Sequence, residues 1–553
     1  MVAVVLAVVV ATGLLVGLLR WTGADTPATG PPSAATVLEP AQAWFHAWET
    51  DDRAAMASMA GVTGPAKDKM LAALAAYRDG LGGLERTGGK LQVTAGTPRI
   101  EQDRADVPYV ASVTLAGLGT WDYPGTVTVV RAGGKDGDWQ TVWNPSDLYP
   151  GLTDTRHLDL AVTWPARAPL VLADGTPAAG KVSATILGRV GPATAAQASS
   201  LGPPYRAGQA IGVSGLQASQ ERLLAGTPAV DVRLLEGTVV VGVPYHQDGT
   251  MPLPATVTID PHLQAVAQQA LDGAPPGKLA AMVVIRPSTG DILVSASRPA
   301  GGYDRAFLGL YPPGSTFKTI TTIALLTKGM GLDETISCPA QVAIGGRTFV
   351  NAEGHVLGNI PFRRAFAESC NTAFVQLAQR LTPQELRATA DALGFNRDPA
   401  LGVPAATSSV PVPEGPVDLA ASSIGQGRIL VTPLQMATVA ASVATGGYRP
   451  PRLVANGPPV PVTPFAPGVA AATTELMRLV VTDGTGTAAR LPGTPVAGKT
   501  GTAEFGTANP PQTHAWFIAF RGDLAVAVLV DDGGFGGDVA APIAANFFRA
   551  VGG

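Results

Sequence analysis

The first feature of the hydrophobic pattern is an almost uninterrupted apolar run over residues 1–19, followed by a stretch rich in Thr, Pro, Gly and Ala. An apolar run of about twenty residues is long enough to span a bilayer. The composition that follows it is typical of a tether between structured parts of a chain. The pattern therefore predicts a transmembrane anchor over residues 1–21 and a linker over residues 22–36.

Two other interpretations of this run were weighed. A cleaved signal peptide would need a small-residue A-x-A-like site at the end of the run, and none stands out there. A buried core helix is disfavoured because the uncharged run leads directly into a Pro- and Gly-rich segment. Arg20 follows the run instead of preceding it, which the positive-inside rule does not favour. The expectation remains a single-pass anchor in the cell membrane, with the rest of the chain on the extracytoplasmic face.

Helical periodicity starts at about Val37. Trp44, Phe45 and Trp48 recur at helical spacing, so we expect them on one buried face. Residues from about 91 to 143 then alternate between apolar and polar as strands do. Helices followed by strands predict a small α+β domain.

Downstream, short strands separated by Gly and Pro turns continue to about residue 250. Two strand pairs, around residues 280–294 and 516–530, then lie far apart with helical stretches between them. Strands at both ends of a region imply one sheet built from distant segments. A last helix is predicted over residues 540–550. The predicted domains cover residues 37–150, 151–255 and 256–553.

Composition excludes some classes of function. The hydrophobic fraction of 46% is ordinary for globular domains, and the net charge is −4. No basic cluster is present that could neutralise phosphates, so we expect no nucleic-acid partner. The six histidines show no metal-ligand spacing, and we expect neither a metal nor another cofactor.

Ser315 and Lys318 are the residues that most directly indicate chemistry. A Pro-Pro-Gly turn precedes Ser315, which places it at the start of a predicted helix. Residues three apart share a helix face, so the Lys318 amine can reach the Ser315 hydroxyl. A serine becomes a good nucleophile when an adjacent base takes its proton, and a helix start supplies N–H groups for oxyanion charge. Taken alone, a surface serine beside a solvated lysine is the commoner explanation.

Two further motifs follow in order, Ser369-Cys370-Asn371 and Lys499-Thr500-Gly501. The combination S-x-x-K, S-D-N and K-T-G occurs in class A β-lactamases and penicillin-binding proteins. Cys370 stands here where that pattern has an aspartate. Three motifs in the same order argue against coincidence.

On these motifs the chain resembles the class B penicillin-binding proteins, D,D-transpeptidases of cell-wall assembly. Residues 256–264, 424–427, 432–436 and 514–517 also resemble segments of the family's transpeptidase domain. Upstream segments resemble the N-terminal domain of methicillin-resistance penicillin-binding proteins and the linking pedestal, or dimerisation, domain; they are residues 41–59, 143–152 and 215–226. The family's Arg-Gly turn in the pedestal is degenerate here, as Ala166-Arg-Ala-Pro169.

The resemblance implies an α+β multidomain protein. Its transpeptidase domain, with the penicillin-binding/β-lactamase-like fold, would have an antiparallel sheet flanked by helices. That domain would follow an extended β-rich pedestal and a small NTF2-like α+β domain. The expected partners are peptidoglycan stem peptides, β-lactams as covalent inhibitors, the membrane, and a glycosyltransferase of the division or elongation machinery.

The motifs also suggest roles for individual residues. The expected catalytic groups are the nucleophile Ser315, the general base Lys318, the proton relay Ser369 and the cationic Lys499. Burial and the Lys499 charge would lower the pKa of Lys318, which has to lose its proton to act. The expected substrate-binding residues are Asn371, Thr500, Gly501 and Thr502, with Gly501 leaving room for a close approach of substrate. By resemblance, the backbone N–H groups of Ser315 and Thr502 form the oxyanion hole.

Four other functions are compatible with parts of this pattern. A class A β-lactamase needs a deacylating glutamate in an E-x-x-L-N motif, and none occurs between Asn371 and Lys499. A D,D-carboxypeptidase uses the same motifs with water as acceptor; only the domain layout favours transpeptidation. Intact Ser315, Lys318 and Lys499 weigh against a non-catalytic scaffold. The presence of only one apolar run, with no second span toward a cytoplasmic signalling domain, weighs against a β-lactam sensor.

Only two cysteines occur, Cys338 and Cys370. Low cysteine use fits an exported protein that relies on hydrophobic cores. The sequence leaves open whether the two form a disulfide or stay as buried thiols. Cys370 as an alternative nucleophile lacks an obvious local base.

Overall fold

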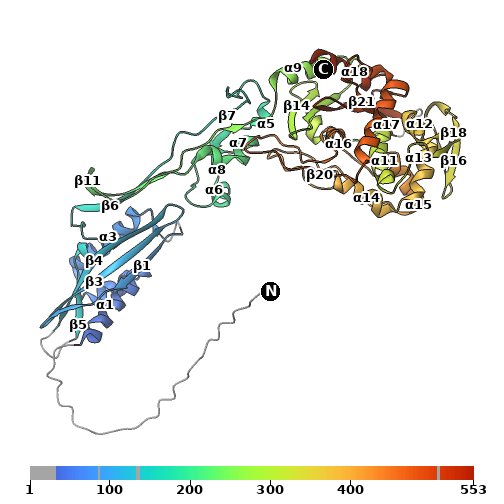
Figure 1. Ribbon diagram of the computed structural model, residues 1–553. Helices are drawn as coiled ribbons and strands as arrows, with labels where there is room; N and C mark the ends of the chain where they lie inside the picture. Colours follow the sequence, from blue (N-terminus) through green and yellow to red (C-terminus); the bar gives the residue numbers. More distant parts are fainter. Residues whose placement is uncertain (1–32, 85–87, 133–137, 507–510, 553) are drawn as a thin grey trace, which may run out of the picture. The chain divides into compact units, whose positions relative to one another are not determined.

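The structure is a computed structural model that describes residues 33–84, 88–132, 138–506 and 511–552 (Figure 1). The predicted anchor, residues 1–21, lies outside the described residues. Within the described residues, no helix combines the length and the apolar character needed to cross a membrane. The chain divides into two compact units, described separately below. One comprises residues up to Ala161 together with Asp231–His246, and the other Val162–Val230 together with Gln247–Gly553.

The first unit begins with three helices: α1 (Ala34–Glu49), α2 (Arg53–Met59) and α3 (Gly64–Gly80). α1 starts inside the segment that the sequence assigns to a linker, because the Ser33 hydroxyl accepts the Thr36 N–H and caps the helix. Trp44, Phe45 and Trp48 are buried, which confirms the predicted core face.

An antiparallel sheet follows, with strand order β1-β3-β4-β5 and β2 paired to β3. Its strands are β1 (Lys90–Ala95), β2 (Arg99–Glu101), β3 (Arg104–Leu115), β4 (Gly119–Arg131) and β5 (Trp139–Val142). Alternate residues of β3 are buried, as a strand with one covered face requires. Tyr109 of β3 contacts both Phe45 and Trp48 of α1 in edge-to-face geometry. The predicted helix-then-strand α+β arrangement is confirmed.

A three-stranded sheet of order β11-β10-β6 comes next. Its strands are β6 (Arg156–Thr163), β10 (Ala229–Glu236) and β11 (Val239–Gln247). Between β6 and β10 the chain forms short elements: β7 (Leu170–Val171), α5 (Ala184–Leu187), β8 (Val190–Pro192), α6 (Ala195–Leu201), β9 (Ala210–Gly212), α7 (Gly215–Ser219) and α8 (Glu221–Ala225). Residues 151–255, which the sequence assigns to one domain, are therefore divided between the two compact units. The domain boundaries drawn from sequence remain predictions.

The second unit is built around a five-stranded antiparallel sheet of order β14-β13-β23-β22-β21. Its strands are β13 (Ala280–Arg286), β14 (Asp291–Arg298), β21 (Ala497–Phe505), β22 (Gln512–Arg521) and β23 (Leu524–Val530). Figure 1 shows β14 in green and β21 in orange-red within one domain. Both predicted hairpins are present, and Ala280 of β13 pairs with Val530 of β23. The prediction of one sheet from distant segments is confirmed.

Helices cover both faces of this sheet. Alternate residues of β13 enter two separate cores: Ala281, Val283 and Ile285 enter one, and Met282 and Val284 enter the other. The first core includes α16 (Pro433–Thr445), and the second includes α9 (Pro261–Leu271) and α18 (Ala540–Ala550). Because both faces are covered, β13 is apolar almost throughout instead of alternating. The predicted last helix is confirmed as α18.

The chain between β14 and β21 carries most of the remaining elements. Its helices are α10 (Arg305–Leu308), α11 (Lys318–Thr327), α12 (Phe362–Ala367), α13 (Asn371–Leu377), α14 (Pro383–Ala392), α15 (Gly415–Ser423) and α17 (Val469–Asp483). Its short strands are β15 (Thr335–Cys338), β16 (Gln341–Ile344), β17 (Arg347–Val350), β18 (Gly358–Pro361), β19 (Gly447–Tyr448) and β20 (Thr463–Pro464), and β12 (Ala255–Thr256) precedes α9. β21 forms the edge of the central sheet, and α17 and the turn before α11 both contact it.

Candidate active site

Ser315 lies in a single 3-10 turn, η2 (Gly314–Phe317), that leads directly into α11. The sequence predicted an α-helix start, and the tighter turn is a small correction with a consequence. In a 3-10 turn, side chains three residues apart eclipse one another. Lys318 therefore stands over Ser315, and its Nζ lies 3.0 Å from the Ser315 Oγ.

The backbone before Ser315 is held by three other segments. Tyr311 exchanges two backbone hydrogen bonds with Val431, and the Gly314 N–H donates to the Gly425 carbonyl. The Trp516 indole donates to the Pro312 carbonyl at 2.9 Å. Gly425 belongs to the 424–427 turn, which lies directly against Gly314.

Gly314 shows why this turn needs a glycine. Its φ is +52°, and a Cβ there would lie 2.5 Å from the Thr502 carbonyl oxygen. The absence of a side chain lets the turn that carries Ser315 pack directly on β21. Ser315 and Thr502 are thereby brought next to one another.

Lys318 is fully buried, and four oxygen atoms surround its amine. Its Nζ lies 2.6 Å from the Ser369 carbonyl and 2.7 Å from the Asn371 Oδ1. The hydroxyl oxygens of Ser315 and Ser369 lie at 3.0 and 3.1 Å. The carbonyl and the amide oxygen can only accept, so they take two N–H groups. A neutral amine has two N–H groups and one lone pair. With both N–H groups taken by these oxygens, the lone pair points toward the hydroxyls of Ser315 and Ser369.

The electrostatics favour this neutral form. Burial lowers the pKa of Lys318 well below its ordinary value, and the charge of Lys499 lowers it further. No carboxylate is bonded to the Lys318 amine, whose partners are the serine and amide oxygens. An amine with a lowered pKa in contact with a hydroxyl has the chemistry of a general base.

Ser369 lies between the two lysines. Its Oγ is 3.1 Å from the Lys318 Nζ and 2.9 Å from the Lys499 Nζ. Its backbone φ is +55°, a left-handed conformation that costs a non-glycine residue about 1–2 kcal/mol. The bond from Lys318 to the Ser369 carbonyl helps to maintain that conformation. The strained turn directs the Ser369 side chain toward both lysine amines.

Lys499 extends from β21 into the same cluster and is fully buried. Burial lowers the pKa of Lys499 to about 7. Besides the Ser369 Oγ, its amine donates to the Thr500 carbonyl at 3.0 Å. The structure thus joins the three motifs in one connected set of hydrogen bonds, from Ser315 through Lys318 and Ser369 to Lys499.

The remaining predicted residues of β21 divide between its two faces. Strand alternation places Lys499 and Gly501 on one face and Thr500 and Thr502 on the other. A Cβ at Gly501 would lie 2.7 Å from the Thr316 Cγ2 and 3.0 Å from the Trp516 Cβ. Protein packing therefore gives this glycine a structural reason, and the expectation that it also leaves room for substrate stays a prediction.

Two contacts of the threonines were not anticipated from sequence. The Thr500 Oγ1 lies 2.6 Å from the Thr485 Oγ1, and the Thr502 Oγ1 accepts the Gly536 N–H at 3.3 Å. The only sequence signal for Thr485 is its position between two glycines, which is equally typical of a loop.

Cys338 and Cys370 form a disulfide with a Cα–Cα distance of 6.3 Å. The structure thereby decides a question that the sequence left open, and it excludes Cys370 as a free nucleophile. Cys370 lies between Ser369 and Asn371, so the bond attaches this turn to the end of β15.

We expect reduction of this disulfide to lower the free energy of unfolding of the second unit by about 3 kcal/mol. The reason is that the cross-link closes a loop of 32 residues in the unfolded chain. Thermal unfolding with and without a phosphine reductant measures this. A Cys338→Ala/Cys370→Ala variant is the control and should not respond to the reductant. Identical melting of the reduced and oxidised wild type, with alkylation proving reduction, would contradict the expectation.

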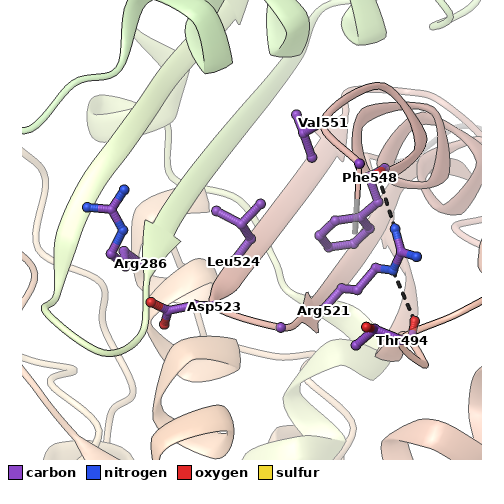
Figure 2. A pocket seen from close by; sticks show the side chains of 9 residues that line it. Arg286, Thr494, Arg521, Asp523, Leu524, Phe548 and Val551 are labelled. Carbon is purple, nitrogen blue, oxygen red and sulfur yellow. Dashed lines mark hydrogen bonds between the residues drawn. The ribbon is translucent and has the colours of Figure 1, made fainter.

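A separate cavity of about 250 Å³ lies beside the β22–β23 turn and α18 (Figure 2). Arg521 lies at its edge, and its guanidinium donates to the carbonyls of Thr494 and Phe548. Arg286, Asp523 and Leu524 contribute further lining. None of the predicted site residues lines this cavity, so it is not part of the candidate active site.

Comparisons with known families agree with this geometry. Residues 280–549 match the penicillin binding protein transpeptidase domain, and residues 36–156 match the NTF2-like N-terminal transpeptidase domain. Peptidoglycan D,D-transpeptidase PbpA of Mycobacterium tuberculosis is 36% identical over 359 residues, which cover 53% of this chain and 71% of that protein. The corresponding protein of Mycolicibacterium smegmatis is 37% identical and covers 52% of this chain and 70% of its own length.

Solved structures resemble the chain in the same way. Penicillin-binding protein A from M. tuberculosis, as a ceftriaxone acyl-enzyme complex, is 33% identical with a TM-score of 0.50. The match covers 54% of this chain and 80% of that one. Pseudomonas aeruginosa PBP2 is 25% identical with a TM-score of 0.57, over 70% of this chain and 96% of that one. The chain belongs to the class B penicillin-binding proteins and carries an NTF2-like N-terminal domain of the methicillin-resistance type.

Proposed function

We propose that this chain is a peptidoglycan D,D-transpeptidase that cross-links stem peptides through an acyl-enzyme on Ser315. The observation that carries the proposal is the 3.0 Å contact between the Ser315 hydroxyl and the buried Lys318 amine. The curated relatives described above are named as enzymes of this kind. Family membership and the constellation of side chains therefore support the same reaction.

In the acylation step, the Ser315 Oγ attacks the carbonyl carbon between two D-alanines of a donor stem peptide. Its proton passes to the neutral Lys318 amine, and the carbonyl oxygen becomes an oxyanion. The backbone N–H groups of Ser315 and Thr502 are the proposed donors to that oxyanion. The close packing of Gly314 on the Thr502 carbonyl supports this assignment, because it brings the two backbones together.

Collapse of the tetrahedral intermediate breaks the C–N bond, and the terminal D-alanine leaves with a proton on its amine. Ser369 is the proposed relay for this proton, because its hydroxyl contacts both Lys318 and Lys499. An amine from a second stem peptide then attacks the ester and transfers its proton back along the same route. Ser315 is regenerated and a new amide bond joins the two peptides.

Substrate orientation is assigned to the other predicted residues. Asn371 is already engaged, since its Oδ1 accepts from Lys318 and its Nδ2 donates to the Val350 carbonyl at 3.1 Å. Lys499, Thr500 and Thr502 are the proposed partners of the terminal carboxylate of the donor peptide. A β-lactam carries a carboxylate and a reactive amide in a comparable arrangement, so we propose that it acylates Ser315.

A product assay tests the reaction itself. A donor peptide ending in D-Ala-D-Ala, supplied with an amine acceptor, should yield D-alanine and a cross-linked product. Mass spectrometry measures the ratio of cross-linked to hydrolysed donor as the acceptor concentration rises. Hydrolysis alone at every acceptor concentration would establish a D,D-carboxypeptidase. No release of D-alanine, together with no acylation by penicillin, would contradict the proposed function.

The cellular setting is proposed from the sequence. We propose that residues 1–21 anchor the chain in the cell membrane as a single span, with the catalytic domain on the extracytoplasmic face. A glycosyltransferase of the division or elongation machinery would supply the glycan strands. Carbonate extraction of membranes tests the anchor: the full chain should stay in the pellet and a chain lacking residues 1–21 should be released. Release of both would contradict the anchor.

A further inference from the structure

Thr485 connects two of the three motifs. Its backbone N–H donates to the Ala367 carbonyl at 3.2 Å, two residues before Ser369. Its hydroxyl lies 2.6 Å from the Thr500 hydroxyl on β21. Gly484 permits this approach, because a Cβ there would lie 2.5 Å from the same Ala367 carbonyl. Thr485 is thus held by its backbone while its side chain contacts Thr500.

The hydrogen count at this contact decides what Thr500 can do. Each hydroxyl has one hydrogen, so only one of the two threonines donates in the 2.6 Å bond. If Thr500 donates, it has no hydrogen left for an anion. If Thr485 donates, the single hydrogen of Thr500 is available. The alternative acceptor for Thr485 is the Ala367 carbonyl at 3.4 Å, a longer contact to an oxygen that already accepts the Thr485 N–H.

Thr502 is arranged in the same way. Its Oγ1 accepts the Gly536 N–H at 3.3 Å, and a backbone N–H can only donate. The hydrogen of the Thr502 hydroxyl is therefore free to donate elsewhere. Both threonines that strand alternation places on this face of β21 contact a neighbouring segment: the Thr500 hydroxyl lies 2.6 Å from the Thr485 hydroxyl, and the Thr502 hydroxyl accepts the Gly536 N–H.

We propose that Thr485 is a positioning residue that makes Thr500 a hydrogen-bond donor, so that Thr500 and Thr502 together select a carboxylate on the substrate. This inference rests on the proposed function and deepens it. Two hydroxyl donors on the same face of β21 favour an acceptor-only anion. They discriminate against an ester at the same position, which has lost the negative charge.

The test compares benzylpenicillin with its methyl ester, using the second-order rate constant for acylation of the full chain. Replacing Thr485 by valine keeps the shape and removes the hydroxyl. We expect the acid-to-ester ratio to fall about tenfold, the effect of one hydrogen bond to a charged group. Thr485→Val should weaken the binding of benzylpenicillin and should change the limiting acylation rate little. Thr485→Ser keeps the hydroxyl and should restore the ratio.

A double-mutant cycle separates positioning from a direct contact. If Thr485 acts through Thr500, then Thr485→Val should have no further effect on the ratio in a Thr500→Val background. An equal loss for acid and ester, no loss, or failure of serine to rescue would each overturn the inference. Wild type that is acylated by neither compound would instead contradict the proposed function, so the two failures are distinguishable.

Discussion

Replacing Ser315 by alanine should abolish covalent labelling of the chain by a fluorescent penicillin. The hydroxyl of Ser315 lies 3.0 Å from the only lysine amine whose pKa is lowered both by burial and by a neighbouring cation within the described residues. Removing it leaves no side-chain oxygen at position 315 of the 3-10 turn to attack the β-lactam carbonyl. Labelling is measured by gel fluorescence, and the labelled peptide is mapped by mass spectrometry.

Ser369 is the alternative nucleophile that this experiment tests, because its hydroxyl contacts both lysines. Persistent labelling of Ser315→Ala, mapped to the peptide that contains Ser369, would move the nucleophile to the second motif and overturn the proposed mechanism. Ser200→Ala is a matched control on the exposed face of α6 and should label like wild type. The melting temperature of Ser315→Ala should stay near that of wild type, because Ser315 is only partly buried.

Replacing Lys318 by methionine should lower the acylation rate constant by about a hundredfold or more, the effect of removing a positioned general base. Methionine nearly preserves the length of this fully buried side chain and avoids a large cavity. Lys328→Met is the matched control, because Lys328 caps the other end of α11 and pairs with Glu385 at the surface. An exposed ion pair contributes little, so this variant should acylate normally.

The pH dependence of the acylation rate is a second measurement of whether Lys318 is the general base. The base works when neutral, so acylation by wild type should rise with pH as Lys318 loses its proton. Because its pKa is lowered well below the ordinary 10.5, the rise should be complete in a range where a normal lysine is still charged. Lys318→Met should lose this rise. Near-normal acylation by Lys318→Met at neutral pH, or an unchanged pH profile, would contradict the assignment of the base.

Local patterns were enough to predict the helix start at Ser315, the last helix, the two hairpins and the three motifs. The hairpin β13–β14 follows from two apolar strands on either side of a Ser-Thr-Gly-Asp turn, and the last helix is α18. The eight predicted site residues occur in three motifs whose order is itself a strong signal. Two details came only from the fold: Ser315 lies in a 3-10 turn, and Thr316 and Trp516 pack where a Cβ of Gly501 would lie.

The amino-acid sequence by itself determined which side chains are candidates for the chemistry, because serine and lysine side chains at these motif spacings can be recognised along the chain. Only the tertiary structure decided how they meet. The pKa of Lys318 is lowered because other segments bury it beside Lys499, and Cys370 is bonded because β15 lies within reach. The proposed role of Thr485 depends on the Thr500 hydroxyl, which the fold places 2.6 Å from its own. Such properties depend on distances between residues far apart in the chain, and no local pattern encodes those distances.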